Sequence, residues 1–504
     1  MASTNTIQHY STDLIPGMDI QTTIQKIQDV KKQAVTTAQT DEKTIKQQIS
    51  DWGDVSSSIS TLTDSLDALR SYDTWSKMNV TSSNTTAVSA TANASAEIKT
   101  YAVQVTHLAQ SHTVASNTTA ALGVSSSTDD LIAAGTLTAG QTFTIEGQTF
   151  TVGTDEYGVT DGGKETITSL MKKINGAASG MTNKVTASII DNRLVLTRVA
   201  TGSSQINMSD PGVGGGAAPL QTLGFLNADE TFNSANVIQQ AQNAQFSVNG
   251  LSVTRASNTN LTDVIQNVTL SLGAETSIPV TLAIAHDTIA PTTAIQSFVT
   301  NYNAAVAKLL SYSSVTLNGD SAPTVGDLQG DSMIPTMLSQ LRSMATATKT
   351  AFFPDASYSF NGKTGNMVSL QDIGVWTTGK ENQLSVIDST RLDQMLANNF
   401  SKVQQLFQGL PTSKGYVHGV ASDLYNYAYQ LSTPMSGDIA KHVFVIQKSD
   451  NDALAHIKTM QDDIARQEQD LWAQFSSVQS SIQQMKADTS WLGTGSSSSS
   501  SSGG

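Results

Sequence analysis

Residues 41–69 read DEKTIKQQISDWGDVSSSISTLTDSLDAL, and their apolar side chains recur at intervals of three or four residues. This is the period of a helix whose narrow apolar stripe faces other helices. Asp41 is the expected N-cap. The stripe predicts the core of a helical leg domain and comprises Ile45, Ile49, Trp52, Val55, Ile59, Leu62, Leu66 and Leu69.

A second stripe of the same period lies near the other end of the chain, in residues 450–492. Its members are Ile457, Met460, Ile464, Leu471, Phe475, Val478, Ile482 and Met485. We interpret it as a coiled-coil seam that is available for contacts with partners in an assembly. The inner face of an ordinary helical bundle is the alternative interpretation.

A weaker helical pattern precedes residue 41. It places Ile20, Ile24, Ile27 and Val30 on one face, and the β-branched and polar run at 35–37 is expected to interrupt it. Such a segment has too little apolar surface to hold a helix alone. Residues 1–40 are therefore predicted to be a flexible coiled-coil segment in the isolated protein, with this face as a second contact seam.

The middle of the chain alternates polar with apolar or β-branched residues, which is typical of strands. Hairpin turns are expected at Gly147, at 191–192 and at Asn249-Gly250. Helical patterns return after Pro291 and at 331–345, 390–407 and 415–431.

This order predicts an α+β multidomain fold, in which a helical leg or stem from both chain ends carries nested β-rich head domains. A linear string of domains is the alternative. The predicted divisions are a flexible N-terminal coiled-coil segment 1–40, a leg domain 41–72 and 290–449, a head domain 73–127 and 239–289, an inserted outer head domain 128–238, a C-terminal coiled-coil segment 450–492 and a disordered Ser/Gly tail 493–504.

Composition excludes several classes of function. The net charge of −14 disfavours binding to nucleic acid and to anionic membranes. The absence of cysteine excludes disulfides, thiolate nucleophiles and zinc–thiolate sites. No apolar run reaches the length of a membrane span, and the N-terminus lacks the pattern of a cleaved signal peptide.

Motifs that carry catalysis are also missing from the sequence. No histidine pair has metalloprotease spacing, and the glycines at 212–216 follow Pro211 without the strand and helix that a nucleotide site needs. The acidic stretch 154–163 does not fit a calcium loop. The sequence therefore predicts no catalytic, cofactor-binding or metal-binding residues and no cofactor, so the protein is not expected to be an enzyme.

Five stretches in order resemble one family, the flagellar filament cap proteins. The first stretch, LIPGMDIQTTIQKI at 14–27, resembles the family's opening, although a richer Gly/Ser run usually precedes it. The strand AEIKTYAVQVTHLA at 96–109, which follows the helix of the opening stripe, is the most specific. The others lie at 165–202, 244–272 and 369–409.

The resemblance implies a non-enzymatic protein at the extracellular tip of the bacterial flagellum. Family members are exported by the flagellar type III apparatus without a cleaved signal peptide. They form a ring of copies that engages flagellin at the filament tip, promotes its folding and insertion, and prevents its loss. The family's export chaperone binds the C-terminal region, which corresponds to about 450–492 in this chain.

Some family members also bind host mucin, a property that the sequence leaves open. Two other classes remain as alternatives. A surface adhesin that binds host glycans or mucin would fit the Ser/Thr-rich middle, but no cell anchor is visible. Another axial hook-associated protein would share the terminal heptads, but the typical flagellin opening is missing.

Overall fold

The structure is a computed structural model that describes residues 20–211, 218–319, 321–349, 357–360, 363–377, 379, 382–412 and 415–494. It contains two compact units. One is built from both ends of the chain, through Thr74 and from Thr288 onward, and the other spans Trp75–Asp287. Of the segment 1–40 that was expected to be flexible, residues 1–19 lie outside the described residues, as does most of the expected Ser/Gly tail, and residues 20–40 belong to a helix.

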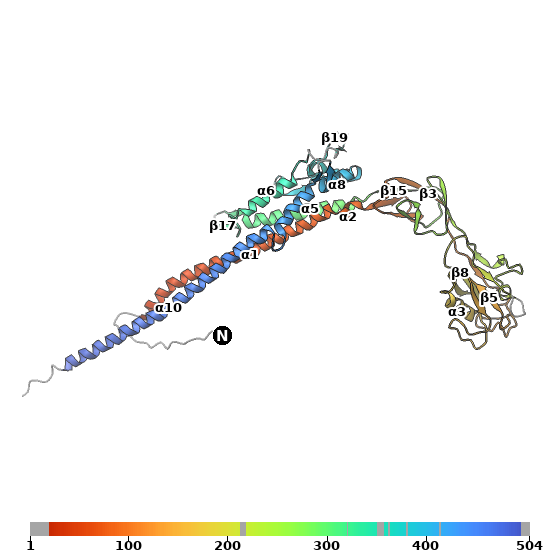
Figure 1. Ribbon diagram of the computed structural model, residues 1–504, viewed down its shortest axis with the longest axis horizontal. Helices are drawn as coiled ribbons and strands as arrows, with labels where there is room; N and C mark the ends of the chain where they lie inside the picture. Colours follow the sequence, from red (N-terminus) through yellow and green to blue (C-terminus); the bar gives the residue numbers. More distant parts are fainter. Residues whose placement is uncertain are drawn as a thin grey trace, which may run out of the picture. The chain divides into compact units, whose positions relative to one another are not determined.

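The terminal unit is a helical bundle with small hairpins (Figure 1). Its helices are α1 Ile20–Arg70, α5 Ile289–Ser313, α6 Met333–Ala345, η2 Leu370–Ile373, α7 Ser389–Asn398, α8 Phe400–Gln408, α9 Val420–Ser432 and α10 Asp438–Thr494, with α2 Tyr72–Ser76 at the boundary. Its antiparallel hairpins are β16 Val315–Asn318 with β17 Ser321–Val325, β18 Ser357–Phe360 with β19 Lys363–Asn366, β20 Val375–Thr377 with β21 Leu384–Val386, and β22 Gly409–Thr412 with β23 Gly415–His418. No helix among the described residues combines the length and apolar character needed to cross a membrane.

The stripe on α1 forms the centre of this bundle, where α1 contacts α5 and α9. Trp52, Ile59, Leu62, Leu66 and Leu69 are fully buried, while Ile45 and Ile49 are half-buried. Burying such large apolar side chains stabilises a fold by roughly 1.5–3 kcal/mol each. This segment of α1 therefore depends on bundle packing as well as on helix propensity.

The interruption expected at residues 35–37 is wrong, because α1 runs without a break from Ile20 to Arg70. Val35 is buried, and the hydroxyls of Thr36 and Thr37 donate to the carbonyls four residues earlier at 3.0 Å. Threonine side chains bonded in this way stay within the helix instead of competing with its backbone hydrogen bonds.

Two further helix boundaries differ from the expectation. The helix predicted at 390–407 is two helices, α7 and α8, because Asn399 leaves helical geometry at φ −134° and ψ 32°. The start of the helix predicted at 415–431 is strand β23, and α9 begins only at Val420. Periodicity alone did not detect either feature. In the second case, the residues just before α9 pair with β22 in a hairpin.

The second unit contains an inner module of two antiparallel sheets. The five-stranded sheet has the order β1 Met78–Ser82, β15 Val280–His286, β3 Thr100–His107, β11 Ala244–Val248 and β12 Leu251–Arg255. The three-stranded sheet has the order β13 Leu261–Ile265, β14 Val268–Leu272 and β2 Val88–Ala92. Alternate side chains such as Val103, Val105 and Phe246 fill the core.

A second module in this unit has its own core. Its four-stranded sheet has the order β10 Val237–Gln239, β4 Thr113–Ala115, β8 Arg193–Arg198 and β7 Val185–Ile190, and its three-stranded sheet is β6 Gln148–Thr151, β5 Thr142–Ile145 and β9 Met208–Ser209. The short helices are α3 Ile167–Ala177, α4 Pro219–Thr222 and η1 Ser234–Asn236. The chain enters through β4 and leaves through β10, and these two strands are neighbours. The second module is thus inserted between β3 and β11, which pair directly with each other.

An ion pair lies within this inserted module. The Lys173 ammonium is 2.6 Å from Glu165 Oε2, and both side chains are at most 1% exposed. Glu165 also accepts hydrogen bonds from Ser169 Oγ at 2.6 Å and from the Gly153 backbone at 2.9 Å. A buried carboxylate needs such a set of donors, because burial removes its water.

We predict that Lys173→Met destabilises the inserted module by about 3–5 kcal/mol, because it leaves the Glu165 charge buried without its counter-ion. The measurement is chemical unfolding of the full-length protein followed by amide exchange in residues 165–177. Lys172→Met is the matched control, since Lys172 is exposed and one residue away. Equal stability of the two variants would contradict the prediction.

Candidate interaction site: the α1–α10 helix pair

The seam of α1 continues from the bundle core toward the N-terminus. Its buried and half-buried positions before Trp52 are Ile24, Gln28, Lys31, Val35, Ala38, Glu42, Ile45 and Ile49. These positions step alternately by four and three residues, which is the heptad repeat of a coiled coil. One apolar stripe thus passes from the bundle into a two-helix stem.

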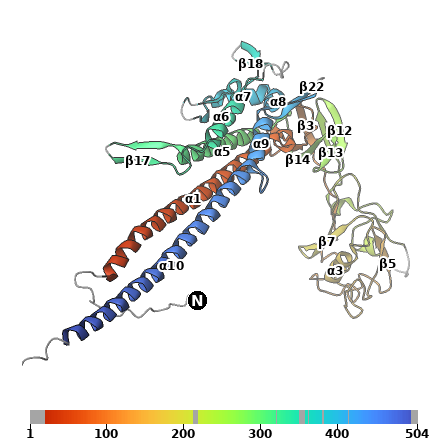
Figure 2. The same cartoon turned by 60° about the vertical axis from the view of Figure 1, so that its left-hand side comes forward.

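Helix α10 lies beside α1 and runs in the opposite direction (Figures 1 and 2). The Trp52 ring contacts the His442 ring edge-on, with centroids 5.0 Å apart, whereas Lys31 lies beside Ile464. The facing positions of α10 follow a heptad pattern as far as Ile464 and are Ile439, Val443, Ile446, Asp450, Ala453, Ile457, Met460 and Ile464. Beyond this point the half-buried apolar side chains include Leu471 and Phe475, outside a strict heptad.

The structure divides the residues predicted for the N-terminal seam. Ile24 is buried at 3% exposure, but Ile27 and Val30 are 41% and 74% exposed. Ile27 and Val30 therefore do not face α10, and their contact with a filament or partner stays a prediction. The heptad counted back from Trp52 passes through Gln28 and Lys31 instead, and a search restricted to apolar residues missed both. The side chain of Ile20 lies outside the described residues.

The predicted C-terminal seam residues become more exposed along α10. Ile457 is buried at 7% exposure. Val478 and Met485 are exposed, and α10 continues past the first described turn of α1 (Figure 2). The remaining members are half-buried and are Met460, Ile464, Leu471, Phe475 and Ile482.

Polar side chains interrupt the seam. The Nε2 atom of Gln28 and Oδ1 of Asp450 are buried without a hydrogen-bond partner among the described residues. Glu42 pairs with Lys46 one turn away, and this hydrogen bond and charge raise the pKa of Lys46, with Asp450 adding to the effect. Polar residues at seam positions fix the register of a coiled coil at a cost in stability.

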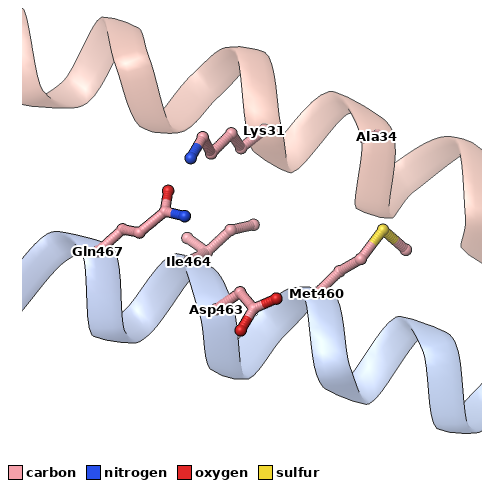
Figure 3. A pocket seen from close by; sticks show the side chains of 6 residues that line it. All are labelled: Lys31, Ala34, Met460, Asp463, Ile464 and Gln467. Atoms are coloured by element: carbon pink, nitrogen blue, oxygen red, sulfur yellow. The ribbon is translucent and has the colours of Figure 1, made fainter.

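A cavity of about 210 Å³ opens between the two helices next to these polar positions (Figure 3). Ala34, Met460 and Ile464 supply its apolar wall, and Lys31, Asp463 and Gln467 supply its polar lining. Side chains from both α1 and α10 therefore line the cavity.

Two histidines near the strand β3 have different surroundings. His107 is exposed and lies 3.4 Å from Glu275, whereas His112 is fully buried and accepts a hydrogen bond from the Ile206 backbone. Burial lowers the pKa of His112. Within the described residues, no group of three or more His, Asp or Glu side chains is placed to hold a metal ion.

These observations define an α+β multidomain protein whose two ends pair through a heptad seam and carry β-rich modules between them. Comparison with known proteins identifies the family. The profile "Flagellar hook-associated protein 2 N-terminus" matches residues 16–112, and "Flagellar hook-associated protein 2 C-terminus" matches residues 241–487. The chain belongs to the flagellar hook-associated protein 2 family, the filament caps. Members of this family form the distal tip of the flagellum, outside the cell.

Two curated relatives agree with this assignment. Flagellar hook-associated protein 2 of Escherichia coli K12 is 28% identical over 423 residues, which is 82% of each chain. The A-type flagellar hook-associated protein 2 of Pseudomonas aeruginosa is 28% identical over 431 residues, or 81% of each chain. A crystal structure of the flagellar cap protein FliD from E. coli aligns with 78% of this chain and 99% of its own, at 26% identity and a TM-score of 0.46. The adhesin alternative receives no support from these comparisons.

The heptad register yields a direct test. We predict that Ile24→Asp lowers the free energy of opening of the helix pair by about 2–4 kcal/mol, because it places a charge at a buried seam position. Amide exchange of residues 22–40 and 455–475 measures this opening. The matched control Val30→Asp, on the exposed side of the same helix, should leave exchange unchanged, and equal effects would show that the register is wrong.

Proposed function

We propose that the chain is a structural, non-enzymatic cap at the distal end of the flagellar filament. There it promotes the folding and insertion of exported flagellin subunits and prevents their loss. The observation that supports this function best is the match of the two family profiles to both chain ends, which meet in a single antiparallel helix pair. A cap must engage the filament and release it repeatedly, which requires contacts of modest strength.

The proposed partners are flagellin at the filament tip, further copies of this chain in a ring, and an export chaperone that binds residues 450–492. The polar interruptions of the seam and the increasing exposure along α10 fit a surface that pairs with other helices. The proposed contact residues are Ile24 and Ile457 when the pair opens, and otherwise Met460, Ile464, Leu471, Phe475, Val478, Ile482 and Met485. Export would proceed through the flagellar type III apparatus without a cleaved signal peptide.

The proposal assigns a separate role to each part of the chain. The terminal helical unit would serve as the leg that reaches the filament, and the inner β module as the head that contacts neighbouring copies. The inserted module would form the outer head. Its own core and its attachment through the adjacent strands β4 and β10 support this division.

A clean deletion of the gene tests the cap function. We expect the deletion strain to release flagellin monomers into the medium and to lack filaments, because nothing retains the subunits at the growing end. Immunoblotting of the medium and electron microscopy of the cells are the measurements. Filaments of normal length in the deletion strain would refute the proposal.

A double substitution tests the role of α10. We expect Ile464→Asp with Phe475→Asp to abolish filament growth when the variant replaces the wild-type protein, because two charges enter the contact surface. Ala465→Asp with Ala473→Asp is the matched control, since both alanines are exposed on the same helix. Circular dichroism checks that the β modules stay folded. Normal filaments with the first variant would contradict the assigned contact surface.

A further inference from the structure

The hairpin of β16 and β17 forms an arm, residues 314–325, that extends from the end of α5 (Figure 2). All of its residues at 314–317 and 322–325 are exposed. A two-stranded hairpin is at best marginally stable in water unless one of its faces is covered. Within the described part of the chain, the arm therefore lacks the covering surface that such a hairpin needs.

One face of the arm is apolar. Val315 and Leu317 lie two residues apart on β16 and so point to the same side, and Val325 pairs directly with Val315. Thr316 and its partner Thr324 lie on the other side. This alternation is typical of a strand pair that buries one face. Leu317 is nevertheless 82% exposed in the single chain.

The base of the arm is held in place. The Gly326 N–H donates to the Ser314 carbonyl at 3.0 Å, and the Leu328 N–H donates to the Tyr312 carbonyl at 2.9 Å, near the end of α5. A side chain on Gly326 would clash with the Tyr312 carbonyl, so glycine is needed for this close approach. Leu328 itself is buried. The apolar face is therefore presented from a fixed base.

A second uncovered apolar surface lies on α10 in the same helical unit. Phe444 and Val445, which we call the α10 patch, are 68% and 62% exposed on the side of α10 turned away from the seam. Asp331, just after the arm, lies with its Oδ2 atom 2.6 Å from Nε2 of His442, two residues before the patch. The base of the arm and the α10 patch are therefore at the same level of the helical unit.

Charges favour contact between the arm and the α10 patch. Lys441 and Lys448 are exposed and share one side of α10 with the phenylalanine of the patch, three residues before it and four residues after it. Asp327 is exposed at the base of the arm, and the segment between β16 and β17 contains Asp320. Lys441 also lies 3.1 Å from Asp438, a weak surface ion pair. In a chain with a net charge of −14, a local match of opposite charges helps two copies to meet.

The size of the apolar face indicates what covers it. Stable free-standing complexes use about 20–30 residues a side, whereas the arm offers only a few apolar side chains. A contact this small suits an assembly in which other contacts already hold the copies together. In a closed ring, each copy meets its two neighbours through two different surfaces. The arm and the α10 patch are two such surfaces on one chain.

We propose that the arm of each copy docks its apolar face, formed by Val315, Leu317 and Val325, on the α10 patch of a neighbouring copy. This contact rests on the proposed ring of copies and adds a joint within the helical unit. In the docked state Leu317 and Phe444 cover each other, and the removal of both side chains from water drives the contact.

Disulfide cross-linking tests the contact, because the chain has no cysteine of its own. Leu317→Cys and Phe444→Cys are made as two single-cysteine proteins, and cysteine keeps both positions apolar. We expect mild oxidation to join the two proteins, both when they are mixed in concentrated solution and when they are produced together in the deletion strain. A disulfide requires Cα atoms closer than about 7 Å, so it reports a direct contact.

Thr316→Cys with Phe444→Cys is the matched control for the cross-link. Thr316 is also exposed on the arm but points to its other face, so this pair should cross-link much less than the first. Equal yields from the two pairs would overturn the proposal. So would the absence of the Leu317–Phe444 cross-link from both samples.

A series of aspartate substitutions tests the energetics of docking. Leu317→Asp should raise the dissociation constant between copies by about tenfold or more, which is the effect of uncovering one large apolar side chain. Thr316→Asp adds the same charge to the other face of the arm and should change this constant by less than about threefold. Sedimentation equilibrium measures the association, and circular dichroism checks that each variant is folded.

The double variant shows whether the two side chains meet. Phe444→Asp alone should weaken association as much as Leu317→Asp does. Both substitutions together should weaken it by much less than the product of the two effects, because they remove the same contact. Effects that multiply would show that Leu317 and Phe444 act independently, and the proposal would be wrong.

The outcomes also separate the docking contact from the cap function. Absence of the cross-link, with a deletion strain that lacks filaments, would refute the docking alone. A Leu317→Asp variant that associates normally but grows no filaments would show that the arm contacts flagellin instead of another copy, and the proposal would again be wrong. Normal filaments in the deletion strain would refute the cap function, whereas a cross-link between purified copies would still support the docking.

Discussion

The structure depends on one helical register. Trp52 fixes it, because its ring is fully buried between the bundle and His442, and every seam position on either side follows at heptad spacing. On the C-terminal side of Trp52, the stripe is apolar and surrounded by other helices. On the N-terminal side, the same stripe meets a single partner, α10, and contains Gln28 and Lys31. A single helix thus joins a strongly packed core to a weakly packed stem.

The sequence was sufficient to predict the fold class and the residues of the bundle core. Large apolar side chains at regular spacing determine which face of a helix is buried. It was insufficient where polar residues take seam positions. Gln28 and Lys31 occupy the seam, whereas Ile27 and Val30 are exposed, since the register is set by Trp52 and α10 rather than by local hydrophobicity. The break at Asn399 also escaped periodicity, because the buried Leu396 and Val403 on either side of it are seven residues apart, which fits a continuous helix.

Buried charge is handled in two different ways in this chain. In the inserted module, Glu165 is neutralised by Lys173 and by further donors, so the charge persists inside a core. Where α1 enters the bundle, the buried Asp51 accepts a hydrogen bond from the Gln47 amide, and burial raises its pKa. The first arrangement fixes a structure that is costly to disturb. The second leaves one carboxylate oxygen, Asp51 Oδ2, buried without a hydrogen-bond partner among the described residues, which costs stability.

The attachment of the inserted module has an evolutionary consequence. Strands β3 and β11 pair directly, and β4 and β10 lie side by side, so the two ends of the insertion are already close together. The inserted module starts and ends at nearly the same place. The entropy cost of bringing its two ends together therefore rises only slowly with the length of the insertion. Changes within residues 116–236 therefore need not disturb the pairing of β3 with β11. In evolution, this segment can diverge, or be exchanged as one piece, while the inner sheets keep their structure. The two family profiles end at residue 112 and resume at residue 241, which are the two sides of this junction.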